Sequence, residues 1–567
     1  MRHALTNFGL ILLLTAVTLV STGNAAVKGY GSPKAIKGGT FTIGYPDYPK
    51  DLLFYLGFDE PSEGINGQIL ETLLNQDPDT YEFTPGLASE WTISKDKMVF
   101  TFTIDPSAHF SDGKPVTAKD VKFTWDTILN PKNKTAPFQA VYESFESCKV
   151  TGERTLEFKA KTLHFKNFEK LAGLIILPEH FYSQGDFNRA FHTKILGSGA
   201  YMLDSLVQGE KIVLKRDPNW WADKKPENLG MNNFDKLVYR AVPDYNVQFE
   251  LFKKGELDYF YFLSAKMWST ETEGPQFQKN YIKKLKVEND TPFGTQGFVW
   301  NLRRPLFQDQ KVRMALTHLM DRKRWIKELF YNNYVEATGP VAFHSVYHSP
   351  KNKPVPYDPA KARELLKAAG WTTAASDGVL TKNGQRFEFE MMMDNPALQR
   401  LLTLYQEELK KVGIKMTIRS YDWATSIKLG DDRQFDAVMQ ARSRDVDPAD
   451  FAVGWGTKAA DTKGSPNTSG YKNPELDKLA DQVDETFDKK KRIPLVQKID
   501  DILGHDQPMS FTYEASYFRL AHWNKFSFPG KGYYRYSTWK NVFNTWWLDP
   551  QKEAQLKEAV AKAVPLP

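Results

Sequence analysis

Residues with catalytic side chains occur throughout the 567-residue chain, but their spacing does not match the common catalytic motifs. Gly197-Ser198-Gly199 lacks the residues that separate serine from glycine in a GxSxG nucleophile elbow, which indicates a tight turn. Gly113-Lys114 continues to Pro115 without the earlier glycine of a phosphate-binding loop. His344 and His348 stand between two prolines, which disfavours a helical face that could share a metal ion.

Cys148 is the single cysteine of the chain, so an internal disulfide and a multi-cysteine zinc or iron–sulfur site are excluded. Asp and Glu total 69, but the sequence cannot pair two of them across a cleft, so a glycosidase stays open as an alternative. We therefore expect ligand capture rather than catalysis, with no cofactor and no metal site.

The charge and the aromatic content of the chain limit the kinds of ligand that it is expected to bind. The net charge of +6 comes from 75 basic and 69 acidic residues, which is too dilute for a dedicated nucleic-acid binder. Aromatic residues reach 14%, with Phe 38, Tyr 25 and Trp 14. Such a surplus fills large cores or lines a cleft that stacks on ligands, and composition leaves both open.

The first 26 residues have the pattern of a secretory signal peptide. Arg2 begins a short basic start, and the apolar run Leu10–Val20 is too short to span a bilayer. Small residues follow, so we expect cleavage after Ala25 or Ala26, with an uncleaved anchor as the alternative. No cysteine is near this position, which excludes a lipid anchor. We expect a soluble protein in the periplasm of a double-membraned bacterium.

The elements that would position a binding site alternate between strands and helices. Strands are expected over residues 40–44 and 99–104, and Thr117 with Asp120 predicts a capping box that starts a helix. A hairpin is expected around Gly209.

The clearest α/β unit is a strand over 387–391, a helix from Asn395-Pro396 to Gly413 and a strand over 414–418, which predicts a locally parallel sheet. Two further helices are expected over 358–370 and 473–487. The absence of a low-complexity linker indicates lobes built from interleaved segments.

Several segments carry a resemblance that keeps one order along the chain. They are PGLASEW (85–91), VFTFTIDPSAHFSDGKPVTAKDV (99–121), GSGAY (197–201), RDPNWW (216–221), FKKGELD (252–258) and GYKNPELD (470–477). Together they resemble the extracellular solute-binding protein family 5, the peptide- and nickel-type binding subunits of bacterial ABC importers. The resemblance covers residues 37 to 548. GFVWNLRRPLFQDQKVRMAL (297–316) with Leu329-Phe330-Tyr331 is most similar to the oligopeptide and microcin C-type branch.

The resemblance implies an α/β fold, a two-lobed periplasmic binding protein clamp of type II in the large peptide-binder class. The expected division gives lobe one residues 27–70, 196–293 and 508–567, an inserted subdomain residues 71–195, and lobe two residues 294–507. Two hinge crossings are expected, near Phe293 and Pro508. In such a clamp a ligand that contacts both lobes shifts the population towards the closed state.

Candidate contacts follow from this cleft. Tyr45 and Asp47 come after the first strand and are expected to reach the cleft, with a surface turn as the alternative. Trp423 follows a lobe-two strand, with core packing as the alternative. Trp455 stands between two glycines, which predicts a loop position in the cleft.

The resemblance also marks one departure. Relatives place the aspartate that holds a peptide's free amino group three positions before the acidic residue of an acidic–Pro step, here Asp447-Pro448. That position is Arg444 in this chain, with Asp445 and Arg442 nearby. The departure puts free-amine recognition in doubt and favours a carboxylate, a phosphate-bearing or a blocked peptide. The alternative is a solvated basic turn.

The sequence therefore predicts a periplasmic binding subunit that captures oligopeptides or peptide-like conjugates and delivers them to an ABC permease and ATPase complex. A monomer is expected, without nucleic-acid partners. An oligosaccharide ligand on the same scaffold and a secreted hydrolase are the alternatives.

Overall fold

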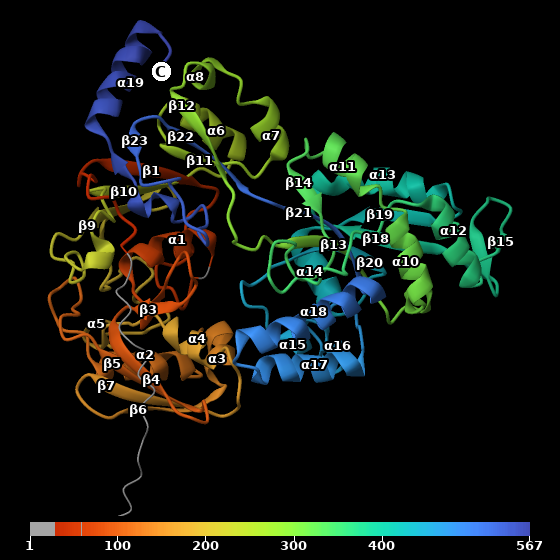
Figure 1. The fold of residues 1–567 in the computed structure, drawn as a ribbon, viewed down its shortest axis with the longest axis horizontal. Helices are drawn as coiled ribbons and strands as arrows, with labels where there is room; N and C mark the ends of the chain where they lie inside the picture. Colours follow the sequence, from red (N-terminus) through yellow and green to blue (C-terminus); the bar gives the residue numbers. More distant parts are fainter. Residues whose placement is uncertain (1–28, 58) are drawn as a thin grey trace, which may run out of the picture.

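The computed structural model describes residues 29–57 and 59–567, which form two lobes that lie side by side (Figure 1). The predicted signal peptide over residues 1–26 lies outside the described residues. Over the described ranges, none of the helices has both the length and the hydropathy needed to cross a bilayer.

Lobe one is built on a seven-stranded sheet with the order β12-β22-β11-β1-β10-β9-β8. Its strands are β1 (Thr40–Tyr45), β8 (Tyr201–Val207), β9 (Lys211–Arg216), β10 (Lys236–Ala241), β11 (Tyr259–Tyr261), β12 (Ile282–Val287) and β22 (Phe518–Trp523). The predicted first strand is β1, which pairs in parallel with β10. The predicted hairpin is β8–β9, where Gly209 has a φ of 74° that suits glycine.

Helices and short elements complete lobe one. They are α1 (Glu60–Ile69), η1 (Pro226–Asn228), α6 (Tyr245–Lys253), α7 (Ala265–Thr270), α8 (Pro275–Gln278), β23 (Phe526–Ser527), η3 (Val542–Thr545), β24 (Trp547–Leu548) and α19 (Pro550–Lys562). The C-terminal segment thus returns to the lobe in which the described chain begins (Figure 1).

A smaller subdomain is inserted between α1 and β8. It holds the pair β2 (Leu74–Gln76) and β3 (Phe83–Pro85), and a four-stranded sheet of β4 (Ala88–Ile93), β5 (Val99–Ile104), β7 (Thr155–Ala160) and β6 (Phe145–Val150). Its helices are α2 (Ala118–Leu129), α3 (Ala136–Tyr142), α4 (Asn167–Ala172) and α5 (Glu179–Tyr182). The predicted capping box of Thr117 and Asp120 is confirmed at the start of α2.

Lobe two is built on a six-stranded sheet with the order β14-β21-β13-β20-β18-β19. Its strands are β13 (Thr295–Trp300), β14 (Tyr334–Glu336), β18 (Glu388–Met393), β19 (Lys415–Ser420), β20 (Ala437–Arg442) and β21 (Met509–Ala515). The predicted α/β unit is confirmed, because β18 and β19 are parallel neighbours joined through η2 (Pro396–Leu398) and α13 (Gln399–Lys410).

The remaining elements of lobe two surround this sheet. They are α9 (Pro305–Gln308), α10 (Gln310–His318), α11 (Arg322–Glu328), α12 (Pro359–Ala368), β15 (Thr373–Ala374), β16 (Leu380–Lys382), β17 (Gln385–Arg386), α14 (Trp423–Asp431), α15 (Phe451–Trp455), α16 (Thr457–Ala460), α17 (Pro474–Glu485) and α18 (Lys489–Asp506). The two further predicted helices are α12 and α17, and each begins at a proline after an Asp or Asn cap.

The chain passes between the two main sheets twice. The first passage, between β12 and β13, contains Phe293 as expected from the sequence. The second differs from the expectation near Pro508, because β21 pairs with β13 and β14 of lobe two and the chain leaves only after Ala515. Only two residues separate β21 from β22, so the sequence gives no turn signal that would show the two strands to belong to different sheets.

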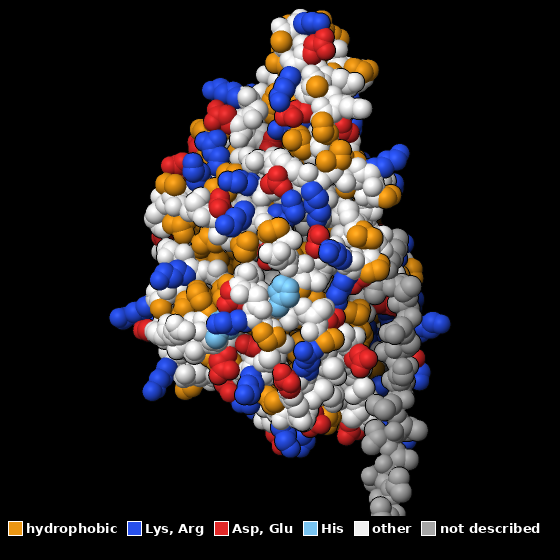
Figure 2. Space-filling view, turned by 90° about the vertical axis from the view of Figure 1, so that its left-hand side faces the viewer, with side chains coloured by type: hydrophobic (Ala, Val, Ile, Leu, Met, Phe, Trp, Pro, Cys, Tyr) orange, Lys and Arg blue, Asp and Glu red, His pale blue; other side chains and the backbone are white. Residues whose placement is uncertain are grey.

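One face of lobe one shows its charges interspersed. In Figure 2 the Lys and Arg side chains alternate with Asp and Glu side chains across the visible surface, and hydrophobic atoms are scattered between them. This visible face carries neither a continuous basic stripe nor a large apolar patch.

Candidate ligand-binding groove

A groove of about 1190 Å³ opens on lobe two. Its walls come from the carboxyl ends of β18 and β20, from α14 and from α15. Because β18 and β20 are parallel, their carboxyl ends lie at the same edge of the sheet, which is where open α/β sheets place ligands. The volume slightly exceeds the usual range for small-molecule sites, about 300–1,000 Å³.

The groove takes its lining from residues far apart in the sequence. The residues that carry charged, amide or aromatic groups into it include Gln296, Asp394, Asn395, Trp423, Asp431, Arg433, Gln440, Arg442, Arg444, Asp445, Asp450, Trp455 and Tyr513.

Trp423 forms an exposed aromatic wall of this groove. It is the first residue of α14, and 68% of its surface is exposed. Ile427, one turn later, also lines the groove and is 46% exposed. Asp422 caps the helix by accepting a hydrogen bond from the Thr425 backbone N–H. The core-packing alternative for Trp423 therefore does not hold, and its indole is available to stack on a ligand.

Trp455 and Arg442 form a packed pair in the wall. Trp455 ends α15, so the predicted loop is in fact a helical turn, and its ring is only 4% exposed. The Arg442 guanidinium carbon lies 4.2 Å from the centre of this ring, a cation–π contact. Arg442 Nη2 donates a hydrogen bond to the Pro466 carbonyl oxygen at 2.9 Å.

Arg444 lies two residues further along and has a different environment. Its Nη1 pairs with the Glu514 carboxylate, and both side chains are buried, with 3% and 1% exposed. Its Nε donates to the Pro340 carbonyl oxygen at 2.9 Å, and Nη2 donates to the carbonyl oxygen of Gly339. The expectation that Arg444 offers its charge to an anionic ligand is therefore corrected, because Glu514 already neutralises that charge. Glu514 lies seventy positions away, so no local pattern reveals it.

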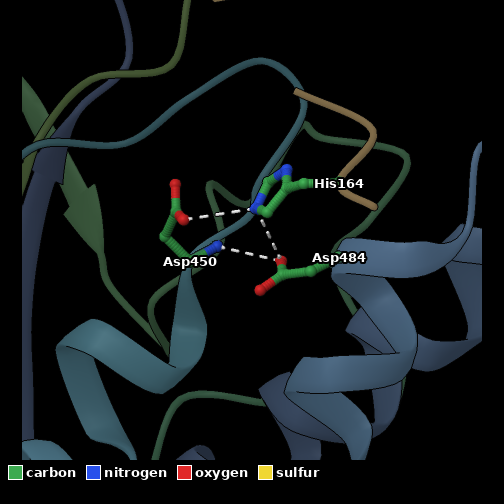
Figure 3. A group of neighbouring side chains, drawn as sticks. All are labelled: His164, Asp450 and Asp484. Carbon is green, nitrogen blue, oxygen red and sulfur yellow. Dashed lines mark hydrogen bonds and ion pairs between the residues drawn. The ribbon is translucent and has the colours of Figure 1, made fainter. Parts of the chain in front are cut away.

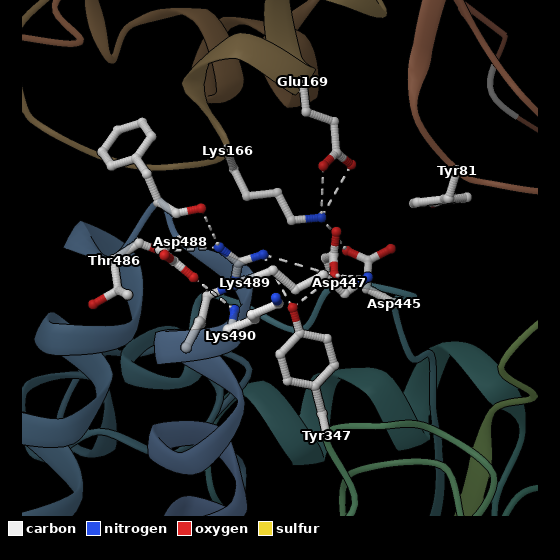
Figure 4. A network of polar contacts seen from close by, with 12 residues as sticks. Tyr81, Lys166, Glu169, Tyr347, Asp445, Asp447, Thr486, Asp488, Lys489 and Lys490 are labelled. Carbon is white, nitrogen blue, oxygen red and sulfur yellow. Dashed lines mark hydrogen bonds and ion pairs between the residues drawn. The ribbon is translucent and has the colours of Figure 1, made fainter. Parts of the chain in front are cut away.

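Asp445 pairs with the inserted subdomain and Asp447 pairs with residues of lobe two, so neither belongs to a free acidic site (Figure 4). Asp445 Oδ2 lies 3.2 Å from Lys166 Nζ of the inserted subdomain. Asp447 accepts a hydrogen bond from the Tyr347 hydroxyl at 2.7 Å and lies 3.3 Å from Lys489 Nζ. Of the two, only Asp445 lines the groove.

Tyr45 and Asp47 lie away from the groove. Tyr45 is 2% exposed and packs against the rings of Tyr239 and Trp539, at centroid distances of 5.8 Å and 5.9 Å. It shares one face of β1 with Phe41 and Ile43, which are both buried, so alternation along the strand directs it into the core. Asp47 is exposed in the loop after β1, and neither residue is among the groove-lining side chains.

Residues 164–166 of the inserted subdomain contact lobe two beside the groove. The Phe165 backbone N–H donates to the Asp484 carbonyl oxygen at 2.8 Å, and the Arg492 guanidinium carbon lies 3.7 Å from the centre of the Phe165 ring. The Lys166 side chain, only 6% exposed, pairs with Glu169 as well as with Asp445 (Figure 4). These contacts join the inserted subdomain to the far side of the clamp.

His164 completes this contact with two carboxylates (Figure 3). Its Nε2 lies 3.4 Å from an oxygen of Asp450 and 3.6 Å from one of Asp484, and the three ligand atoms lie within 4.8 Å of one another. The Lys166 backbone N–H donates to His164 Nδ1 at 3.0 Å. In a neutral ring the remaining proton is then on Nε2 and faces the carboxylates, which fits a polar contact with the two acids better than a metal ligand.

The pKa values in this cluster move in opposite directions. Burial raises the pKa of Asp484 to about 6, and the contact with His164 lowers the pKa of Asp450. Asp450 therefore keeps its negative charge to a lower pH than Asp484 does.

Comparison with known proteins identifies the scaffold. Residues 82–464, more than half of the chain, match the family model described as "Bacterial extracellular solute-binding proteins, family 5 Middle". The chain belongs to this family.

The chain is similar to several known proteins over most of its own length and most of theirs. The chain is 28% identical to "Uncharacterized protein YejA" of Escherichia coli, over 94% of this chain and 92% of the relative. It is 26% identical to "Probable peptide-binding protein YejA" of Agrobacterium fabrum, over 87% of each. The oligopeptide-binding protein AppA of Bacillus subtilis, solved in complex with a nonapeptide, has the same fold with a TM-score of 0.72 and 24% identity, covering 91% of this chain and 100% of that structure.

Proposed function

We propose that this protein is the periplasmic substrate-binding subunit of an ABC importer, and that it captures oligopeptides or peptide-like conjugates in the groove of lobe two. The observation that carries the proposal is this groove, which lies at the carboxyl ends of parallel strands, has one exposed aromatic wall and belongs to a family 5 scaffold. A peptide ligand is supported by the names of two relatives, one a probable peptide-binding protein and the other an oligopeptide-binding protein solved with a nonapeptide.

Capture proceeds through closure of the two lobes. The chain passes between the main sheets after β12 and after β21, and these two passages act as the hinge. A peptide in the groove of lobe two adds contacts to lobe one only when the lobes approach, so it favours the closed state. A micromolar ligand supplies about 8 kcal/mol of binding free energy, enough to shift two states that differ by a few kcal/mol.

The bound peptide is handed on unchanged. The groove supplies stacking surface and charged groups, and capture by closure involves no change of covalent bonds in the ligand. After export and cleavage near Ala25 or Ala26, the monomeric protein delivers its ligand to the permease and ATPase complex at the inner membrane.

Calorimetry with synthetic oligopeptides and with oligosaccharides of similar size tests the proposal, followed by mass spectrometry of the recovered ligand. We expect peptides to bind at micromolar or lower concentration and to be recovered at their original mass. Binding of oligosaccharides alone would move the ligand class to sugars stacked on Trp423. A peptide or sugar consumed with turnover would overturn the binding function and favour a hydrolase.

A further inference from the structure

Three arginines line the groove, and the structure separates them by what their guanidinium groups contact. Arg444 is neutralised by Glu514. Arg433 donates to carbonyl oxygens of Gly430, Thr462 and Ser465 and to the Ser465 hydroxyl. Arg442 differs from both, since a single hydrogen bond to Pro466 is its whole set of polar contacts with the described residues.

The guanidinium of Arg442 is thus incompletely satisfied. Of its five N–H donors, one is used by a carbonyl oxygen. Its Nε is buried without a hydrogen-bond partner, and among the described residues no carboxylate lies within ion-pair distance of it. The indole of Trp455 covers one face of the group. Burial lowers the pKa of Arg442 to about 10, so the group still carries its charge at neutral pH.

Arg442 is placed so that a ligand in the groove can approach the Nη1 edge of its guanidinium. Arg442 is the last residue of β20 and lines the groove together with its neighbours Ala441 and Ser443. Gly454 also lines the groove, and a β-carbon at that position would lie 3.6 Å from Arg442 Nη1. The absence of a side chain there keeps the Nη1 edge uncovered.

A half-buried cation without a counter-charge still loses part of its hydration, and proteins compensate such a group with an anion or with full hydrogen bonding. The Trp455 ring and the Pro466 carbonyl supply part of this compensation. A negative group with two oxygens would supply the rest, because a guanidinium binds such a group through parallel hydrogen bonds.

We propose that Arg442, seated on Trp455, is the subsite that binds a carboxylate group of the ligand. This inference rests on the proposed function, since it assigns one group of the captured peptide to one residue of the groove. It transfers to Arg442 the anion recognition that the sequence suggested for Arg444. The carboxylate comes from the C-terminus of the peptide or from an acidic side chain, and the test separates the two sources.

The experiment combines variants of the protein with changes in the peptide. The probe is the tightest binder among a set of synthetic oligopeptides, prepared as the free acid, as the C-terminal amide, and with each Asp or Glu replaced by Asn or Gln. Calorimetry measures each peptide with the wild-type protein, with Arg442→Gln and with Arg442→Lys. Arg363→Gln is the matched control, because Arg363 is an exposed arginine on α12 of lobe two outside the groove.

We expect that the loss of one particular carboxylate from the peptide weakens its binding to the wild-type protein by roughly thirtyfold or more. This is the usual effect when a charged contact shielded from solvent loses one partner. The Arg442→Gln variant should bind the free-acid peptide more weakly by a similar factor. It should bind the neutralised peptide with the same affinity as the wild-type protein. Arg442→Lys should retain part of the affinity, and Arg363→Gln should change nothing. Amidation identifies the C-terminus as the source, and side-chain replacement identifies an acidic residue.

Equal binding of the free acid by wild type and a folded Arg442→Gln would overturn the inference while leaving the proposed function intact. Failure of all peptides to bind the wild-type protein would instead overturn the proposed function. If Arg442→Gln does not fold, the peptide series on the wild-type protein still decides, since an insensitivity to every carboxylate removal contradicts the subsite.

Discussion

Arg442 and Arg444 lie two residues apart at the end of one strand, yet their surroundings assign them different tasks. Arg444 is enclosed by Glu514 of β21 and by two backbone carbonyl oxygens near the return passage of the chain. Arg442 rests on Trp455 and has one hydrogen-bond partner among the described residues. A charge that is fully matched inside the protein holds structure together, whereas an unmatched charge in a groove wall is available to a ligand.

The largest expected effect is on stability, at Arg444. Arg444→Ala should lower the free energy of unfolding by about 3–5 kcal/mol, because it leaves the buried Glu514 carboxylate without its partner. The double variant Arg444→Met with Glu514→Leu should cost less than either single change. Chemical denaturation measures these variants, with Lys122→Ala in the exposed pair with Asp126 as a control expected to cost less than about 1 kcal/mol. Equal stability of wild type and Arg444→Ala would remove the distinction between the two arginines.

An intermediate effect, on the stability of the closed state, is expected at the contact between Phe165 of the inserted subdomain and Arg492 of lobe two. Phe165→Ala removes the ring that packs against Arg492, and we expect it to weaken the closed state by about 1–3 kcal/mol. Bound peptide should therefore dissociate faster, by roughly tenfold, while the unfolding midpoint of the lobes changes little. Stopped-flow displacement measures the dissociation rate. Lys149→Ala, on an exposed strand position of the same subdomain, is the control and should leave the rate unchanged.

The smallest effect on stability is expected at Trp423. Because 68% of this side chain is exposed, Trp423→Ala should change the free energy of unfolding by no more than about 0.5 kcal/mol. Peptide binding should nevertheless weaken by roughly tenfold through the loss of a stacking surface. Thermal unfolding and calorimetry on the same sample separate the two quantities. A change in stability without a change in affinity would place Trp423 outside the ligand site.

The sequence predicts much of the fold and part of the groove. Elements with local sequence signals are predicted correctly, whereas features that depend on distant residues are not. Local signals determine elements such as α2, where Thr117 and Asp120 form the predicted capping box, and the β18–α13–β19 unit. Family segments predict the two lobes. The second boundary between the lobes was predicted near Pro508 but lies after Ala515. The reason is that β21 pairs with β13, which is far away in the sequence, and the residues around Pro508 carry no local signal of that pairing.

Some of the candidate site residues were also predicted correctly, and others were not. Trp423, Trp455, Arg442 and Asp445 line the groove, although Trp455 does so as a buried residue of a helix and not from the predicted loop. Tyr45 is buried because the alternation of β1 directs it into the core. The role of Arg444 depends on Glu514, and Asp394 of the groove was missed although its position directly after β18 is a signal for a ligand site.

Small-angle scattering can follow the closure of the two lobes on a ligand in solution. The radius of gyration of the wild-type protein should fall when the tightest-binding synthetic peptide reaches saturation, because the ligand adds contacts that only the closed lobes can make. The same peptide should produce a smaller decrease in the Phe165→Ala variant, whose closed state lacks one interlobe contact. An unchanged radius of gyration in the wild-type protein, with calorimetry showing full occupancy, would contradict capture by closure.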